Sequence, residues 1–423
     1  MKRRNASWTY YLKTDTGRQV LWLSLVLSAA SLLVAGIALP IQVQSRPSDK
    51  FDNSHFLTFN GIDTAVSACK YYKAIRAITN RNIDCDRVGP ENFDFLQPGD
   101  GKTFNDWKLE NGLRINPDFN GNGNPFDDDT LTGEVSALYF NAVDLALVRS
   151  MHGKTSVVNG VKTTAYYVCN YNTFEDAGED ADNRNAIACV AFDYSADRPF
   201  TKFYVFVGGN LSPFADLDGK KKFVPGLCKA CHGGDKQPRQ PFDDDDRPNG
   251  DIGAHFLPFD LDNFEYLEDS AFSRRAQEGK FKRLNQMILE TDPAPVVKQL
   301  IDGWYLGART EQDREFIPSG WKGHEQLYRR VVKPSCRTCH VAMRPGFNFD
   351  TFGGFENLAS ATQQRVCVDA GVNLPPEVVR LSRSMPNSKV TFDQFWLDRV
   401  RRTVLARFLR DALGDPRLQC PPP

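Results

Sequence analysis

The sequence predicts an α+β fold with an N-terminal membrane helix, a mixed region of helices and antiparallel strands, and a mostly helical C-terminal half. Three observations along the 423 residues support this prediction. An apolar run occupies residues 20–41, and segments rich in Val, Tyr and Phe lie between residues 131 and 220. After residue 270, apolar residues recur mainly at helical spacing.

These changes of pattern divide the chain into five regions. The regions are residues 1–45 (a cytoplasmic N-terminus plus a transmembrane anchor or signal peptide), 46–130 (helices and loops), 131–220 (antiparallel strands), 221–320 (a first cysteine motif) and 321–423 (a second cysteine motif).

The N-terminal apolar run has the length and the flanks of a membrane anchor. It extends for 22 residues, from Val20 to Ile41, whereas a signal-peptide core has roughly 7–15. Basic residues on its N-terminal side would keep that end in the cytoplasm. We therefore expect a single-pass inner-membrane protein with a periplasmic domain, or a periplasmic protein if cleavage occurs near Val43-Gln44-Ser45.

The charge balance bears on the kind of partner, and the cysteine content bears on the cellular compartment. The 52 basic and 53 acidic side chains give no electrostatic reason to expect a nucleic-acid partner. Of ten cysteines, four belong to the two motifs described next, and six remain for three disulfides in an oxidising compartment. Their grouping along the chain favours Cys69–Cys85, Cys169–Cys189 and Cys367–Cys420.

Two Cys-x-x-Cys-His motifs carry the chemistry. They are Cys228-Lys229-Ala230-Cys231-His232 and Cys336-Arg337-Thr338-Cys339-His340. In this pattern each cysteine forms a thioether to a haem vinyl group, and the histidine becomes the proximal iron ligand. A zinc site is the alternative, but zinc ribbons separate their cysteine pairs by only roughly 15–20 residues. The sequence thus predicts two covalent c-type haems and a haem-binding C-terminal half.

The order of features around the second motif resembles a known family. A helical pattern over Glu325–Val332 ends before Pro334, the motif follows, and Met385-Pro386 precedes a long amphipathic helix over residues 392–409. Residues 321–423 therefore resemble the single-haem domain of class I cytochromes c.

The resemblance implies a role for each matching residue. Cys336 and Cys339 would be thioether donors, His340 the proximal ligand and Met385 the distal ligand. Met343 is a competing sulfur, but it follows the proximal histidine too closely to reach the opposite haem face.

No Met-Pro pair follows the first motif, so its distal ligand stays open. The candidates are His152 or Met151 from the β region, His255, and Met287 on a predicted helix, or an open site. We place His152 slightly ahead of Met151 as the distal ligand, because a motif without its own distal loop needs a ligand from another part of the chain.

A calcium loop is a further candidate within residues 46–130. Asp118, Asn120, Asn122 and Asp129 occupy positions 1, 3, 5 and 12 of the calcium-loop pattern, with Gly123 at position 6. The alternative is an Asn/Gly/Asp turn with a solvated acidic end. The expected cofactors are therefore two haem c groups and a candidate Ca²⁺.

Two functions agree with these motifs. The leading one is an electron carrier that transfers single electrons between donor and acceptor proteins, with the membrane contacted through residues 20–41. The alternative is an enzyme resembling dihaem peroxidases, in which the first haem is open or can be opened. The sequence does not settle whether the protein is an enzyme.

Overall fold

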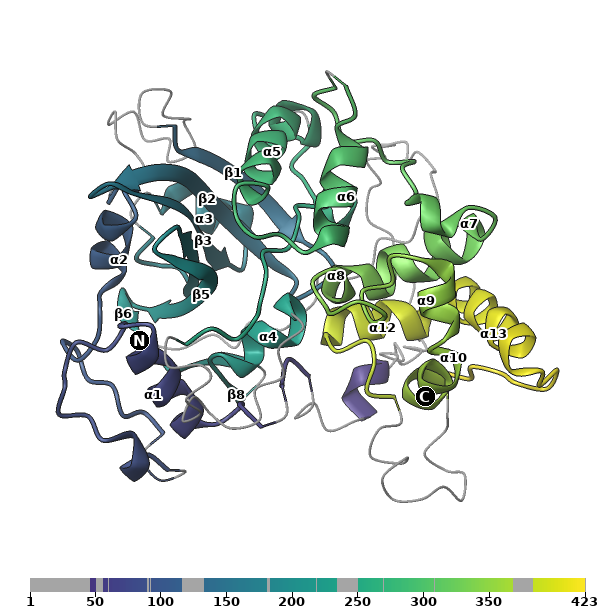
Figure 1. The fold of residues 1–423 in the computed structure, drawn as a ribbon, viewed down its shortest axis with the longest axis horizontal. Coiled ribbons are helices and arrows are strands. Elements are labelled where there is room, and N and C mark those ends of the chain that lie inside the picture. The colour runs from purple at the N-terminus through teal and green to yellow at the C-terminus, as the bar shows by residue number, and fades with distance from the viewer. Residues whose placement is uncertain are drawn as a thin grey trace, which may run out of the picture. The chain divides into compact units, whose positions relative to one another are not determined.

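In the computed structural model, the N-terminal part of the chain is built around an antiparallel sheet (Figure 1). Within the described residues the sheet has seven strands in the order β6-β5-β4-β3-β2-β1-β9, so β1 to β6 form a meander. The predicted α+β class and antiparallel region are thereby confirmed. The sheet strands are β1 Val135–Asn141, β2 Leu147–Val158, β3 Val161–Tyr171, β4 Ala188–Ser195, β5 Arg198–Val207, β6 Asn210–Leu211 and β9 Phe264–Glu265, while β7 Phe214–Leu217 and β8 Lys220–Phe223 pair as a separate hairpin.

Helices precede and follow the sheet in the chain. They are α1 Ala65–Ala74, α2 Phe104–Glu110, α3 Phe174–Glu179, α4 Gly226–His232, α5 Arg274–Ile288, α6 Pro295–Trp304, α7 Glu325–Leu327, α8 Arg337–His340, α9 Phe352–Glu356, α10 Ala359–Thr362, α12 Lys389–Leu397 and α13 Arg399–Leu413. The structure describes residues 46–50, 56–59, 61–89, 91, 93–115, 133–180, 183–217, 219–233, 250–268, 270–307, 309–367 and 383–422.

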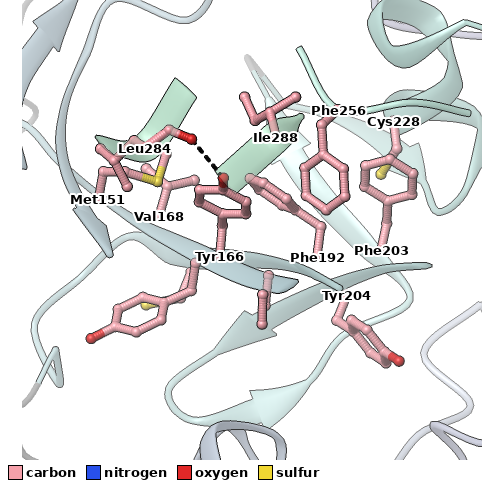
Figure 2. Close-up of a cluster of buried hydrophobic side chains, with 14 of the residues drawn as sticks. Met151, Tyr166, Val168, Phe192, Phe203, Tyr204, Cys228, Phe256, Leu284 and Ile288 are labelled. Atoms are coloured by element: carbon pink, nitrogen blue, oxygen red, sulfur yellow. Dashed lines mark hydrogen bonds between the residues drawn. The ribbon is translucent and has the colours of Figure 1, made fainter. Parts of the chain in front are cut away.

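Side chains alternate between the two faces along each strand, and both faces of the sheet are buried. Tyr166 faces α5, where its hydroxyl donates to the Leu284 carbonyl at 2.7 Å (Figure 2). Its neighbour Tyr167 lies on the other face against Phe104 and Trp107 of α2. The first of these faces is the one that reaches the cysteine motifs.

All three predicted disulfides are confirmed. Cys69–Cys85 ties α1 to the following segment, and Cys169–Cys189 joins directly opposed residues of β3 and β4. Cys367–Cys420 ties the C-terminal end to the segment after α10. Each linkage constrains the unfolded chain and thereby stabilises the scaffold around the motifs.

The helix before the second motif does not stop at Pro334. It continues from α7 through a π-helical stretch, Tyr328–Cys336, directly into α8. A proline lacks an N–H and crowds the carbonyl one turn earlier, so a wider turn accommodates it. The prediction that the helix ends before Pro334 is therefore wrong, because the helix continues through both cysteines of the motif.

The predicted single helix over residues 392–409 is also corrected, because it divides into α12 and α13. Asp398 separates the two helices, and its side chain accepts hydrogen bonds from the N–H groups of Val400 and Arg401. An aspartate in this position satisfies donors that a continuing helix would leave unpaired, so it begins a new helix.

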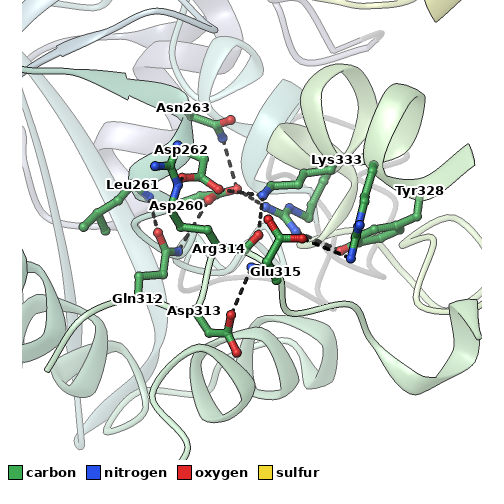
Figure 3. A network of polar contacts seen from close by, with 12 residues as sticks. Asp260, Leu261, Asp262, Asn263, Gln312, Asp313, Arg314, Glu315, Tyr328 and Lys333 are labelled. Carbon is green, nitrogen blue, oxygen red and sulfur yellow. Dashed lines mark hydrogen bonds and ion pairs between the residues drawn. The ribbon is translucent and has the colours of Figure 1, made fainter. Parts of the chain in front are cut away.

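A polar network joins the segment after the first motif to the helix that carries the second (Figure 3). Asp262 accepts from Lys333 at 2.6 Å, from Arg274 at 2.7 Å and from Arg314 at 3.0 Å. Next to it, buried Asp260 pairs with Arg337 of the second motif. These contacts hold the two motif regions against each other.

The fold-class prediction needs one correction, which concerns the membrane helix. No helix in the described part of the chain is long and apolar enough to cross a membrane. The described residues show an α+β fold, and the predicted anchor at residues 20–41 lies outside them. The candidate calcium ligands Asp118, Asn120, Asn122 and Asp129 also lie outside them.

Candidate functional site

The first motif lies on α4, a short helix that follows the β7–β8 hairpin. Cys228 and Cys231 are three residues apart, so they share one side of the helix. Buried Lys229 donates to the carbonyls of Gly233 at 2.7 Å and Ile252 at 2.6 Å. These bonds satisfy the Gly233 carbonyl at the end of the helix and tie the helix to the segment around Ile252.

His232 has one ring nitrogen committed and the other available. Its Nδ1 donates to the carbonyl oxygen of His255 at 2.8 Å. Burial lowers the pKa of His232 to about 4, so the ring is neutral near pH 7. With the proton on Nδ1, Nε2 carries the lone pair, which is the arrangement that a ligating histidine requires.

The second motif repeats this arrangement. His340 Nδ1 donates to the Phe347 carbonyl at 2.6 Å, and the ring stacks on Phe349 with centroids 4.0 Å apart. Burial again lowers the pKa of His340 to about 4. Two sites more than a hundred residues apart in sequence thus present a neutral imidazole oriented by a backbone carbonyl.

A cavity of about 200 Å³ adjoins the first motif. One wall is the inner sheet face, which contributes Met151, Val168, Phe192 and Phe203, and Phe256 packs against it (Figure 2). Cys228, Cys231 and His232 line the same space. The lining is largely aromatic and aliphatic, which suits a flat apolar cofactor.

The structure reverses the predicted preference for His152 over Met151. Neighbouring residues on β2 face opposite sides of the sheet, and Met151 is the one that lines the cavity. His152 lies on the far face, within 3.3 Å of Glu134 Oε1 and 3.2 Å of Ser150 Oγ, stacked on Tyr167. A shift of one residue along a strand changes the face, so His152 cannot serve this cavity.

The other two candidates also lie away from the distal side. His255 supplies the carbonyl that orients His232, and its own Nδ1 donates to the Asp292 carbonyl at 2.7 Å. Met287 is buried in the core on α5 and is not among the described residues that line the cavity. Met151 is therefore the candidate that the geometry retains.

A smaller cavity of about 50 Å³ adjoins the second motif. Cys336, Cys339 and His340 line it together with Met385, as the resemblance implied. Met343 also contributes, but its N–H donates to the His340 carbonyl at 2.9 Å, so its backbone stays on the proximal turn. Met385 belongs to a separate segment that lines the same cavity.

One charged pair of the first cavity was absent from the sequence predictions. Arg149 on β2 pairs with Asp144 at 2.6 Å, and both residues line the cavity. Arg149 shares the inner face with Met151, two residues away. A charged residue at an inward position of a strand is the signal that could have identified it.

The prediction of a metal-binding protein is corrected for ions held by side chains alone. Within the ranges that the structure describes, no group of three or more His, Cys, Asp or Glu side chains could hold a metal ion. The alternative of a zinc site built from both motifs therefore has no support there. A haem differs because its porphyrin supplies four nitrogens, so the protein adds only axial ligands, and the residues present fit that requirement.

Comparisons with known proteins add no assignment. No protein-family model matches the chain, and the comparisons with curated proteins and with solved structures found no match. Any functional conclusion must therefore come from the residues and their geometry.

Proposed function

We propose that the protein is an exported dihaem cytochrome c that transfers single electrons between redox partner proteins. The observation that carries this proposal is the repeated orientation of His232 and His340 by backbone carbonyls, each beside two free cysteines of one helix. Haem supplies reversible one-electron chemistry at iron when bound. Three disulfides support an oxidising compartment, where this attachment belongs.

Each chain residue has a defined role in the proposal. Cys228 and Cys231 attach the first haem, and Cys336 and Cys339 the second, with the adjoining histidines as proximal ligands. Met385 is the distal ligand of the second haem and Met151 that of the first. A thioether is a soft, neutral ligand that favours the reduced metal, so methionine ligation raises the reduction potential relative to histidine.

Aromatic side chains line both cavities. Phe192, Phe203 and Phe256 pack around the first motif, and Phe355 and Phe395 line the second. An apolar surrounding limits solvent reorganisation and disfavours the more highly charged oxidised state. Apolar, packed surroundings of this kind suit a carrier, whose iron would change oxidation state with little rearrangement.

A peroxidase-like enzyme is the second candidate, since the first cavity is the larger of the two. Acid–base catalysis at an open site would need a free Glu, Gln or second His near the metal. Among the described residues that line the first cavity, Asp144 and Asp260 are the acids, and each is paired with an arginine. This pairing favours the carrier.

The test is the haem content of full-length protein exported in a host that attaches c-type haem. Intact mass should show two covalent haems. Cys228→Ala with Cys231→Ala should leave one, and Cys336→Ala with Cys339→Ala should leave the other. A colourless protein of unmodified mass would contradict the proposal, and turnover of peroxide by the two-haem protein would favour the enzyme.

A further inference from the structure

The two motif helices form a single wall between the two cavities. Sγ of Cys231 lies 3.3 Å from Sγ of Cys339, although the residues are 108 positions apart in sequence. Each helix also contributes to the cavity of the other motif. Ala230 of the first motif lines the second cavity. Conversely, Arg337 of the second motif and Val341, which directly follows it, line the first cavity. Each attachment helix therefore serves both sites.

Gly233 permits this close approach. It ends α4 with φ +52°, a backbone conformation that L-residues rarely adopt. A Cβ at this position would lie 2.8 Å from the Ala342 carbonyl oxygen and 3.0 Å from the Ala342 carbonyl carbon. Those are backbone atoms of the segment that follows the second motif, so they cannot rotate away as a side chain would. Any larger residue must push the two motif segments apart.

We propose that the two haem sites form a coupled pair and that Gly233 is the positioning residue that sets their separation. The inference rests on the proposed function, since it concerns groups attached at Cys231 and Cys339. Their sulfurs, thiols in this structure, stand where the thioether sulfurs would be. In a coupled pair the oxidation state of one site alters the spectrum and the potential of the other, whereas separate sites titrate independently.

The experiment compares Gly233→Ala with Gly208→Ala in the two-haem protein. Gly208 has a similar φ of +56° but nothing within 4 Å of an added Cβ, so it controls for backbone strain alone. Redox titration followed by paramagnetic resonance and absorption should show interaction between the two haems in wild type and in Gly208→Ala. In Gly233→Ala both haems should still be attached, but that interaction should weaken.

A second pair of substitutions tests the shared wall without straining the backbone. Val341→Ala should shift the spectrum or potential of the first haem, and Ala230→Ser should shift those of the second. Unchanged coupling in Gly233→Ala, or substitutions that perturb only the haem of their own motif, would overturn the inference. Absence of covalent haem in wild type would instead refute the proposed function, and intact mass separates these two outcomes.

Discussion

The two motif sites share their local chemistry and differ in most of what surrounds it. Both place a Cys-x-x-Cys-His sequence at the end of a helix, with the histidine Nδ1 donating to a carbonyl. The first is walled by a sheet and leaves about 200 Å³, whereas the second is enclosed by helical segments and leaves about 50 Å³. The residues proposed for attachment thus lie within one short segment, while the space beside the histidine and the proposed distal ligand come from the surrounding scaffold.

The comparison also separates the two methionines proposed as distal ligands. Met385 comes from a segment of the same C-terminal region, within 45 residues of His340. Met151 precedes Cys228 by more than seventy residues, and it reaches the first cavity only because its strand is part of the sheet. The methionine proposed for the second site thus comes from its own region of the chain, whereas the one proposed for the first comes from the sheet.

The largest expected effect is loss of one distal ligand. Met385→Ala should convert the second haem to a high-spin form, so about half of the total haem signal changes. Met151→Ala should do the same at the first haem. Paramagnetic resonance and absorption spectra of ferric protein measure both, and cyanide should then bind the altered site.

Histidine substitutions sharpen the same prediction. Met385→His and Met151→His should each keep a low-spin haem but lower its reduction potential, because imidazole favours ferric iron more than a thioether does. Met287→Ala is the control, since this methionine lies outside the described lining of the first cavity. If Met151→Ala leaves the first haem unchanged, Met151 is not its ligand.

The first variable residue of each motif should differ in its contribution to stability. Arg337 forms a buried ion pair with Asp260, and Arg337→Met should lower the free energy of unfolding by about 3–5 kcal/mol because the carboxylate stays buried without its cation. Lys229 bonds backbone carbonyls, so Lys229→Met should cost about 1–3 kcal/mol.

Denaturant unfolding of the two-haem protein measures both values. Adding Asp260→Asn to Arg337→Met should recover part of the loss, since the uncompensated charge is then removed. Equal losses for the Lys229 and Arg337 variants would remove this distinction between the sites.

The smallest expected effect is acid sensitivity of the sheet behind the first site. Burial lowers the pKa of His152 below its usual 6.5. Burial acts to raise the pKa of Glu134, but the hydrogen bond from His152 and the charge of Arg114 hold it below 4.5. For both groups the unfolded chain binds protons first on acidification, so stability falls below about pH 6.5 and more steeply below about pH 4.5.

Hydrogen exchange resolved by segment should show β2 and β3 losing protection at low pH before α12 and α13. Glu134→Gln should flatten the part of this dependence below about pH 4.5. If both regions lose protection at the same pH, His152 and Glu134 do not make the sheet more acid-sensitive than the C-terminal helices.

Local patterns in the sequence were sufficient for the motifs, for the three disulfides and for the antiparallel meander. The motifs and the meander depend on residues close in the chain: two cysteines and a histidine within five positions, or alternating Val, Tyr and Phe between turns. The disulfides followed from the grouping of the six remaining cysteines along the chain, including Cys367 and Cys420, which are 53 positions apart. Met385 could likewise be placed near His340 because both belong to one helical region. Short-range spacing carries this information because helices and hairpins form between near neighbours.

Tertiary structure alone decided which face of β2 meets the first motif, and hence Met151 rather than His152. It also decided that the helix passes through Pro334 and that Cys231 meets Cys339. These outcomes depend on strand register, on packing around a wider helical turn and on the backbone space beside Gly233. The strand register and the contact of Cys231 with Cys339 join segments far apart in the chain, so no spacing within a single segment encodes them.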